Sequence, residues 1–357
     1  MAVNMAARLK RAAMGGKTGL AASLAGFVTA SLAMTLPNEA NAQADFYAGK
    51  QLTLIIGSSA GGGYDVISRL LARHFGRLIP GNPTVVPQNM PGAASLAANN
   101  HLYNQAPRDG TVIGALQRGT LLAKIVNPKG VLFEIDKLNW VGSLNTETGL
   151  VVSLATTPHR TAKDLLEHEL IVGAQAGSDP EISPLLYKNL LGMKFKIVAG
   201  YPGSSEAILA MERNEVQGSG DWGFSSLKAV RPTWLADGKV RILMQGALTK
   251  HKDLPEVPLP MEFAKSEIDR KVLELYFTQK TMARPIVAPP GTPPERLEIL
   301  RKAFEALATD ATFLADAQRS KQDIDIVPGA ELDRIVTTVS KTTPEVAARL
   351  NAATAKN

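Results

Sequence analysis

The stretch that decides the fold is residues 51–65, QLTLIIGSSAGGGYD. Its first seven residues, 51–57, predict a buried strand, and apolar residues from position 65 to 79 then recur on one face of a helix. Glycines and serines fill the gap between the two. A strand that runs through such a loop into a helix is the basic unit of an α/β protein.

The same alternation continues along the chain. Further strands are predicted at residues 84–86, 111–115, 139–143, 149–155, 170–174, 195–199, 216–219 and 239–245, and helices at 93–104, 162–168, 184–191, 205–214 and 293–309. Strands that alternate with helices indicate an α/β fold with mostly parallel sheets. For the last of these helices we expect Thr292 as the N-cap, Pro293 at the first helical position and Glu295 as the partner in a capping box.

Composition sets the class of protein and excludes several chemistries. The chain has 357 residues, of which 45% are hydrophobic and 20% are charged, so we expect a packed protein of two domains. It contains no cysteine and only five histidines. Disulfides, thiolate metal sites and cysteine nucleophiles are therefore excluded, and we expect neither a metal nor a cofactor.

Residues 1–42 have the pattern of a secretory signal peptide that is cleaved on export. Four basic residues lie between positions 8 and 17, an apolar run follows at 19–36, and Ala40-Asn41-Ala42 forms a cleavage site before Gln43. The alternative, a transmembrane anchor, is disfavoured because the run is short and is diluted by Gly, Ser and Thr. We therefore expect a periplasmic protein.

Removal of this segment changes the charge balance. It takes away four of the 39 Lys and Arg residues and one of the 33 Asp and Glu residues, which leaves a net charge of about +3. No stretch of the mature chain combines clustered Lys and Arg with aromatic residues. Nucleic acid is therefore not an expected partner.

Three strand-to-helix loops are rich in Gly and Ser, at residues 58–65, 176–179 and 201–205. Such loops place several backbone N–H groups at the positive end of a helix dipole, which suits a carboxylate or a phosphate. Small polar residues at strand ends are also what a turn requires, so one loop alone decides nothing. Ligands of open α/β sheets do bind at the carboxyl ends of strands, which favours binding where several loops converge.

Two enzyme hypotheses concern the first loop. Its glycines have neither the GxGxxG spacing of a dinucleotide site nor the Gly-Lys-Ser/Thr ending of a P-loop. Residues 57–61 do fit G-x-S-x-G, which makes Ser59 a candidate nucleophile. The loop follows the first mature strand, however, and the only late histidine, His251, lies in a surface turn. A serine hydrolase therefore remains an alternative.

The mature chain resembles a known family over nearly its full length: the Bug or TctC-like solute receptors of tripartite tricarboxylate transporters. The matching segments, in chain order, are the aromatic start at 46–47 with the strand and Gly-Gly-Gly-x-Asp loop at 52–65, Asn-x-Pro-Gly-Ala at 89–93, Ala-Pro-x-Asp-Gly at 106–110, the loop and strand at 201–203 and 216–218, and the proline-rich turns at 254–258 and 288–293. None of these is specific alone, but their order is.

The chain departs from the family pattern at three places. Asp179-Pro180-Glu181 follows the second loop, and Pro184 is expected to open the helix there. Residues 279–285 lack the usual aromatic-Gly strand, and Ser58-Ser59 replaces a more apolar pair. These differences lie near the expected cleft, so they bear on which acid is bound.

The resemblance implies a type II periplasmic binding protein with two α/β lobes and a ligand cleft. Lobe one would be residues 43–145 plus 247–357 and lobe two 146–246, with hinges near 143–148 and 245–249. The protein would be no enzyme. It would be a monomer that captures a small carboxylate and hands it to the membrane permease subunits of a tripartite tricarboxylate-type transporter. A receptor that signals to a sensor kinase is an alternative.

The candidate ligand-binding residues come from both lobes. They are Ser58, Ser59, Gly61, Gly62, Gly63, Tyr64, Asp65 and Arg118 of lobe one, and Ala176, Gly177, Ser178, Tyr201, Gly203, Ser204 and Asp221 of lobe two. Gly62 and Gly63 would let the backbone approach a carboxylate, with a positive φ as one means. Asp65 can instead be a plain first-turn acid, Arg118 a surface residue, and Trp222 a core residue.

Overall fold

The protein is described here by a computed structural model, which covers residues 46–126 and 128–355. The predicted signal peptide, residues 1–42, lies outside the described residues. Within the described part of the chain, no helix is both long enough and apolar enough to cross a membrane.

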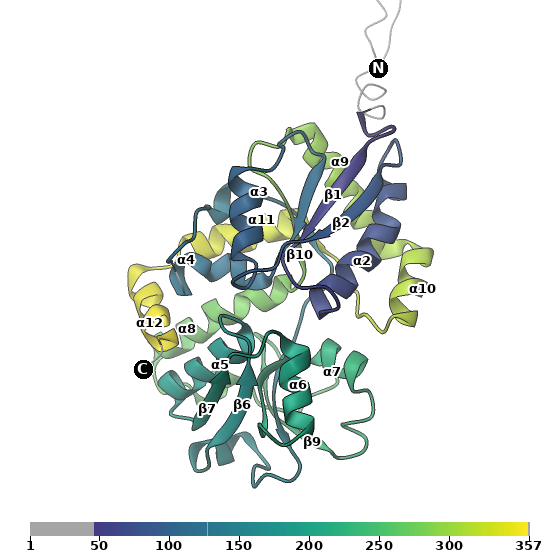
Figure 1. The fold of residues 1–357 in the computed structure, drawn as a ribbon. Helices are drawn as coiled ribbons and strands as arrows, with labels where there is room; N and C mark the ends of the chain where they lie inside the picture. The colour runs from purple at the N-terminus through teal and green to yellow at the C-terminus, as the bar shows by residue number, and fades with distance from the viewer. Residues whose placement is uncertain (1–45, 127, 356–357) are drawn as a thin grey trace, which may run out of the picture. The chain divides into compact units, whose positions relative to one another are not determined.

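The first of two sheets has six strands in the order β11-β4-β10-β3-β1-β2 (Figure 1). Their bounds are β1 Gln51–Ile56, β2 Thr84–Asn89, β3 Val112–Ala115, β4 Asn139–Ser143, β10 Pro285–Ala288 and β11 Val327–Pro328. Strand β1 is parallel to β2 and β3, whereas β10 is antiparallel to β3 and β4 and β11 is antiparallel to β4.

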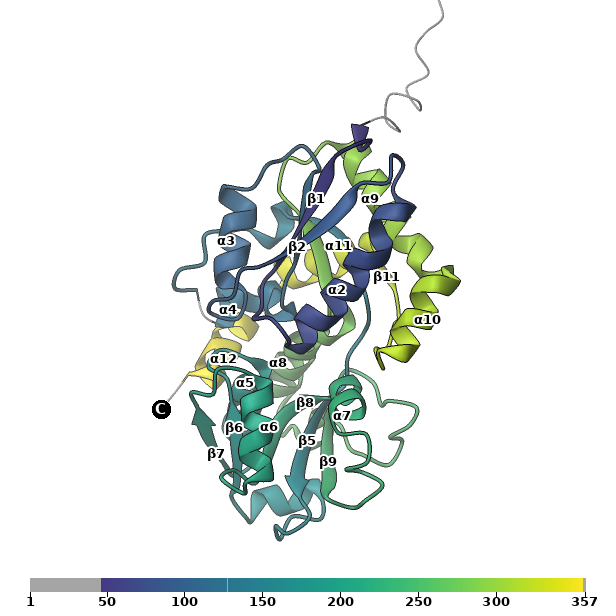
Figure 2. The same ribbon diagram turned by 45° about the vertical axis from the view of Figure 1, so that its right-hand side comes forward.

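The second sheet has five strands in the order β7-β6-β8-β5-β9 (Figure 2). Their bounds are β5 Gly149–Leu154, β6 Leu170–Ala174, β7 Phe195–Ala199, β8 Gly218–Gly223 and β9 Val240–Gly246. Strand β6 is parallel to β7 and β8, and β5 is antiparallel to β8 and β9.

Both sheets are therefore mixed, and the expectation of mostly parallel sheets was wrong. The reversed strands β5 and β10 each follow a passage of the chain from one sheet to the other, through residues 144–148 and 247–284. The chain leaves the first sheet at the carboxyl end of β4 and enters the second sheet at the carboxyl ends of its parallel strands. A strand that enters from that side must run antiparallel to them.

Helices connect the strands and cover the sheets. The α-helices are α2 Gly63–Phe75, α3 Leu96–Asn104, α4 Ala123–Val126, α5 Asp179–Leu186, α6 Ser204–Glu212, α7 Phe224–Val230, α8 Glu267–Thr278, α9 Pro294–Ala306, α10 Ala311–Arg319, α11 Gly329–Ser340 and α12 Pro344–Thr354. The shorter turns are η1 Gly76–Leu78, η2 Arg118–Leu122, η3 Ile135–Lys137, η4 Ala162–Leu166, η5 Tyr187–Leu191, η6 Pro260–Phe263, η7 Gln279–Met282 and η8 Leu307–Thr309.

Three predicted helix starts were wrong. Helix α3 begins at Leu96 rather than at residue 93, because residues 93–95 have a positive φ. Helix α5 begins at Asp179, and Pro184 lies inside it; this proline packs on β8, where a Cβ on Gly220 would come within 2.6 Å of its Cγ. Helix α9 takes Pro293 as its N-cap, while the Thr292 hydroxyl donates to the Pro289 carbonyl at 2.8 Å instead. The start moves by one residue because Pro294, which also lacks an N–H, occupies the first helical position.

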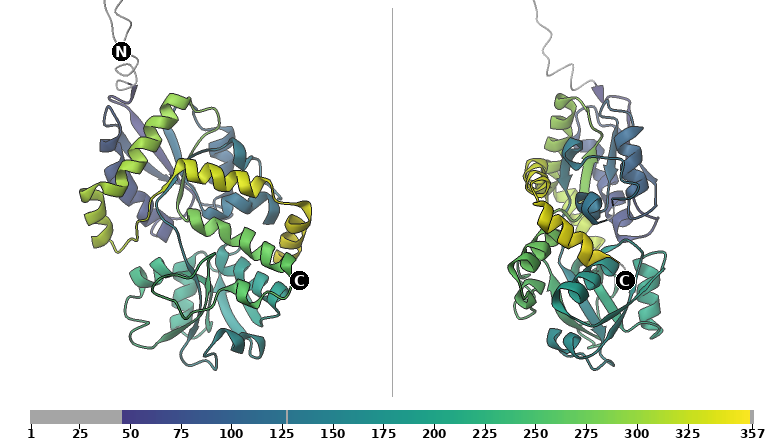
Figure 3. Two further views of the ribbon diagram at one scale, coloured as in Figure 1. Left: turned by 180° about the vertical axis from the view of Figure 1, so that it is seen from behind. Right: turned by 90° about the vertical axis from the view of Figure 1, so that its left-hand side faces the viewer.

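The C-terminal helix contacts elements that belong to both sheets. Helix α12 touches α4, which follows β3 of the first sheet, and α5, which follows β6 of the second, and it packs along α8. Figure 3 shows α12, in yellow, beside α8 in green. Helix α8 in turn places Phe277 against Tyr187 of η5, with ring centroids 6.4 Å apart. Residues 247–284, assigned by prediction to lobe one, thus also pack on elements of the second sheet.

Acidic residues at the start and middle of α10 hold this helix to α2 and to the turn η1 that follows it. Asp316 Oδ2 lies 2.8 Å from His74 Nε2 and 2.9 Å from Arg73 Nη2, and Asp310 pairs with Arg77. The hydrogen bonds from His74 and Arg73 lower the pKa of Asp316 from 3.8 to about 2.

This depressed pKa predicts how stability changes in acid. A carboxyl whose pKa is lower in the folded state contributes stability above its unfolded-state pKa and loses it as the pH falls toward the folded-state pKa. The free energy of unfolding should therefore fall less between pH 5 and pH 2 in Asp316→Asn than in wild type, measured by urea denaturation. The exposed Asp237 provides the control, because Asp237→Asn should keep the wild-type slope. Equal slopes in all three proteins would contradict the prediction.

Candidate functional site

A cavity of about 1040 Å³ is bordered by loops from both sheets. Its wall contains the segments that follow β1, β6 and β7, together with the first residues of α2, α5 and α6. The two sides approach closely: a Cβ on Gly177 would lie 3.9 Å from Ala94, and one on Gly63 would lie 3.8 Å from the Ser226 hydroxyl. The three Gly- and Ser-rich loops therefore converge on one space.

Most of the candidate residues line this cavity. Those in its wall are Ser58, Ser59, Gly61, Gly62, Gly63, Tyr64, Arg118, Ala176, Gly177, Ser178, Gly203, Ser204 and Asp221, together with Trp222. Asp65 and Tyr201 are outside the wall. Trp222 is buried and meets Trp234 edge to face, with ring centroids 5.9 Å apart.

Asp65, which lies outside the cavity wall, fixes the conformation of the first loop. Its buried carboxylate accepts hydrogen bonds from the Gly61 N–H at 2.8 Å, from Arg69 Nε at 2.9 Å and from Asn89 Nδ2 at 2.8 Å. Burial raises the pKa of Asp65, but the hydrogen bonds from Arg69, Gly61 and Asn89 outweigh it and hold the pKa below its usual value. Asp65 therefore stays ionised and positions the loop.

The second loop has the same construction. The Gly177 N–H donates to Glu181 Oε2 at 2.7 Å, four residues along the chain, as Gly61 does to Asp65. Both glycines have a positive φ, +79° for Gly61 and +76° for Gly177. In each loop the glycine makes the left-handed turn that a side chain would strain. The expected positive φ at Gly62 and Gly63 was misplaced: Gly62 has φ −77°, and the turn is at Gly61.

Two residues that the sequence reasoning missed support the first loop. Asn89 Nδ2 also donates to the Ser58 carbonyl at 2.9 Å. Ser95, fully buried, donates from its hydroxyl to the Gly57 carbonyl at 2.6 Å and accepts from the Gln117 N–H at 3.0 Å. Asn89 begins the Asn-x-Pro-Gly-Ala motif, so a signal for it was present, whereas nothing singled out Ser95.

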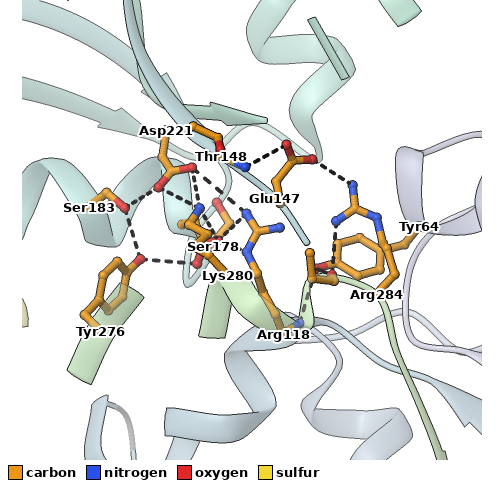
Figure 4. Close-up of polar contacts among 12 residues, drawn as sticks. Tyr64, Arg118, Glu147, Thr148, Ser178, Ser183, Asp221, Tyr276, Lys280 and Arg284 are labelled. Carbon is orange, nitrogen blue, oxygen red and sulfur yellow. Dashed lines mark hydrogen bonds and ion pairs between the residues drawn. The ribbon is translucent and has the colours of Figure 1, made fainter. Parts of the chain in front are cut away.

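The sequence reasoning also missed a buried cation, Lys280. Lys280 of η7 has a side chain only 2% exposed, and its Nζ lies 2.7 Å from Asp221 Oδ1 and 3.2 Å from Asp179 Oδ2. Arg118 of η2 also pairs with Asp179. Figure 4 shows Asp221, Lys280 and Arg118 pointing toward one another. Two cations from segments beside the first sheet thus meet two carboxylates from the second sheet.

Hydroxyl groups complete this buried cluster. The Ser183 hydroxyl donates to Asp221 Oδ2 at 2.6 Å, and the Tyr276 hydroxyl donates to Asp179 Oδ1 at 3.2 Å. Burial raises the pKa of Asp179, but Arg118 and Lys280 outweigh it and hold the pKa well below its usual value. Burial raises the pKa of Asp221 more than Lys280 lowers it.

A third pair lies at the passage between the sheets. Arg284 Nη2 is 3.7 Å from Glu147 Oε2, and the guanidinium stacks 4.3 Å from the centre of the Tyr64 ring. Glu147 also accepts from the Thr148 N–H at 3.1 Å, and the Tyr64 hydroxyl donates to the Ala283 carbonyl at 3.0 Å. The two segments that connect the sheets, residues 144–148 and 247–284, thus meet at the Glu147–Arg284 pair, and Arg284 in turn contacts Tyr64 of the first loop.

No group of three or more His, Asp or Glu side chains that could hold a metal ion occurs among residues 46–126 and 128–355. The arrangement instead offers backbone N–H groups. The first N–H groups of a helix have no acceptor within it. Three helices, α2, α5 and α6, begin in the wall of one cavity, which is a favourable place for an anion.

Comparison with known proteins agrees with the two-sheet fold. No family model matches the chain. A protein of Cupriavidus necator described as "UPF0065 protein in gbd 5'region" is 26% identical over 308 residues, which cover 81% of this chain and 82% of that protein. Among solved structures, a TctC solute binding protein from Polaromonas is 18% identical, covers 86% of this chain and 98% of its own, and has a TM-score of 0.61.

Two further structures extend the comparison. MatC from Rhodopseudomonas palustris, solved with bound malate, is 20% identical with a TM-score of 0.62, over 86% of this chain and 99% of its own. The periplasmic binding protein BugD is 17% identical with a TM-score of 0.64, over 86% of this chain and 98% of its own. The chain has the fold of the TctC and Bug receptors. This confirms the two α/β lobes and the cleft that the sequence motifs indicated for such a receptor.

In this receptor fold the buried cluster predicts a large effect of one substitution. Lys280→Met keeps the length of the side chain but removes the charge shared by Asp179 and Asp221. Breaking a buried ion pair from one side costs about 3–5 kcal/mol, because the partner is left uncompensated. Urea denaturation should show a loss of this size.

Lys302→Met is the matched control, because Lys302 forms an exposed pair with Glu298 on α9. Exposed pairs contribute about 0–1 kcal/mol, so this variant should stay close to wild type. If Lys280→Met were as stable as the control, the cluster would contribute little to the folded state.

Proposed function

We propose that the protein is a periplasmic receptor that binds a small carboxylate-containing metabolite for a tripartite tricarboxylate-type transporter. The observation that carries this proposal is the convergence of the first turns of α2, α5 and α6 on one cavity. Each helix end contributes about 0.3–1 kcal/mol toward an anion in solvent, and more where the site is partly buried. The positions listed above as lining the cavity are the proposed ligand contacts; at Arg118 and Asp221 the contact would be made by uncharged atoms, because their charged groups pair with Asp179 and Lys280.

The glycines between these helices have a specific part in the binding. Gly62 has extended backbone angles, and a Cβ placed on it would meet only the Ser59 carbonyl, at 3.6 Å. The space beside Gly62 is therefore open to the cavity, where a ligand carboxylate can approach the backbone. Closure of lobes 43–145 plus 247–357 and 146–246 around it would present both lobes to a membrane partner.

The hydrolase alternative finds no support in the hydrogen bonding of Ser59. A nucleophilic serine is activated by a base within hydrogen-bond reach. In the described part of the chain, the Ser59 hydroxyl has no such partner, while His251 packs edge to face on Phe224 and accepts the Asp253 N–H at its Nδ1. We therefore propose a binding protein without catalytic activity and without a cofactor, active as a monomer.

The solved neighbours supply the ligand class of this proposal. MatC was solved with malate, and another R. palustris protein, 18% identical, with adipate. Permease subunits are the proposed partner; a receptor that signals to a sensor kinase would bind its ligand in the same way and differ only in that partner.

Gly62→Val tests the site. Because valine suits the backbone of residue 62, the apo protein should unfold at the wild-type temperature, but the new side chain should occupy the space of the ligand carboxylate. Isothermal titration with a carboxylate that binds wild type should show binding weakened by at least about tenfold, which is 1.4 kcal/mol.

Ala315→Val is the control for this experiment, since it introduces a valine on the exposed side of α10, away from the cavity, by adding two carbons to the alanine side chain. It should bind as wild type does. Unchanged affinity in Gly62→Val would place the ligand elsewhere.

Export is tested separately. Protein purified from the cell envelope should have Gln43 at or very near its N-terminus, as determined by mass spectrometry of the intact chain. A chain that still begins at Met1 and sediments with membranes would contradict periplasmic release.

A further inference from the structure

We propose that the ligand carries a single ionised carboxylate on an apolar body, such as an alkyl or aryl chain, rather than two or three carboxylates. This inference rests on the proposed function and specifies the ligand of the same cavity. Two features of the cavity wall carry it: its cations are already paired with the protein's own carboxylates, and part of the wall is apolar.

The cationic side chains of the wall form ion pairs with the protein's own carboxylates. Of the described residues that line the cavity, Arg118 and Arg284 are the only Lys or Arg residues. Arg118 pairs with Asp179, and Arg284 lies against Glu147 and the Tyr64 ring. Lys280, just behind the wall, is bonded to Asp221 and Asp179. No cationic side chain of the described wall is left for a ligand.

The wall also contains more acids than cations. Besides Glu147, Asp179 and Asp221, the residues Glu181 and Glu206 line it. The helix starts can receive one carboxylate through their N–H groups. A second ionised carboxylate would have to leave water without a cation of its own, and burying an uncompensated charge is strongly unfavourable. The electrostatics therefore select against multiply charged acids.

A group of aliphatic and aromatic wall side chains, called the apolar end below, lies on α4, α5 and the segments beside them, and most of the group packs on one core cluster that contains Phe133. From the first-sheet side come Leu96, Val126, Val131 and Phe133, and from α5 of the second-sheet side come Ile182 and Leu185. All of these except the buried Phe133 are half-exposed, so their surface is available to a ligand. Helix α12 contacts both α4 and α5 here, and Thr354 near its end is part of the wall.

The size of the cavity agrees with an extended ligand. A volume of about 1040 Å³ is at the upper end of the range of about 300–1,000 Å³ for small-molecule sites. A carboxylate held at the starts of α2, α5 and α6 leaves the apolar end open for the rest of the molecule. An apolar body there would cover the half-exposed side chains and remove their surface from water.

The test compares acids that differ by one carboxylate. Hexanoate and adipate have the same chain length, and adipate carries a second carboxylate at the far end; benzoate and citrate extend the comparison. We expect isothermal titration of the full mature chain to show hexanoate or benzoate binding at least tenfold more tightly than adipate and citrate.

A variant with a cation at the apolar end should reverse the order. Val131→Lys adds an ammonium group to the apolar wall and should favour adipate over hexanoate. Leu132→Lys is the matched control, because the neighbouring Leu132 is 64% exposed and lies outside the cavity wall. It should keep the wild-type preference. If Val131→Lys does not fold, the near-isosteric Val131→Thr should weaken hexanoate binding severalfold at an unchanged unfolding temperature.

The outcomes separate this inference from the proposed function. Tighter or equal binding of adipate or citrate by wild type would overturn the apolar monocarboxylate and leave a carboxylate receptor standing. Binding of none of the four acids at millimolar concentration would count against the receptor itself. An unchanged preference in a folded Val131→Lys would show that the apolar end is not used.

Discussion

The two lobes are joined at their centre by the ion pairs of Arg118 and Lys280 with Asp179 and Asp221. None of these four groups can be buried alone at an acceptable cost in free energy. Each is bearable because its counter-charge lies on a distant segment: Arg118 follows β3 and Lys280 precedes β10, whereas Asp179 follows β6 and Asp221 lies in β8. The arrangement of the two sheets and the burial of the charges therefore depend on each other. The same pairing occupies the cations of the wall, so an anion in the cleft would have to be bound by backbone N–H groups and hydroxyls.

The glycine-rich loops on the two sides of the cavity are held in place by the same kind of hydrogen bond. In each lobe a glycine turns with a positive φ, and a carboxylate four residues later accepts its N–H: Asp65 for Gly61 and Glu181 for Gly177. The carboxylate ties the loop to the first turn of its helix. A loop tied in this way loses little freedom when a ligand arrives, which favours affinity.

Much of this arrangement could be predicted from the sequence, because the loops carry local signals. The strand and glycine loop of residues 51–65 located one side of the cavity, and residues 176–178 and 203–204 located the other. Lys280 could not be found in this way: it is a lone lysine, and its partners lie 59 and 101 residues away in the chain. Strand β5 was predicted, but its reversed direction was missed because direction is set by where the chain crosses between sheets, which no local spacing records. The short reversed strand β10 was not predicted at all.

Trp222 stands at the wall of the cavity, next to Trp234, while the third tryptophan of the chain, Trp140, is buried in the first lobe. The emission of an indole changes with the polarity of its surroundings. One of only three such emitters therefore lies where solvent would be exchanged for a ligand, beside a second that shares its contacts. A ligand bound beside Trp222 would therefore change the protein's own emission, and occupancy of the cavity could be followed without any added label.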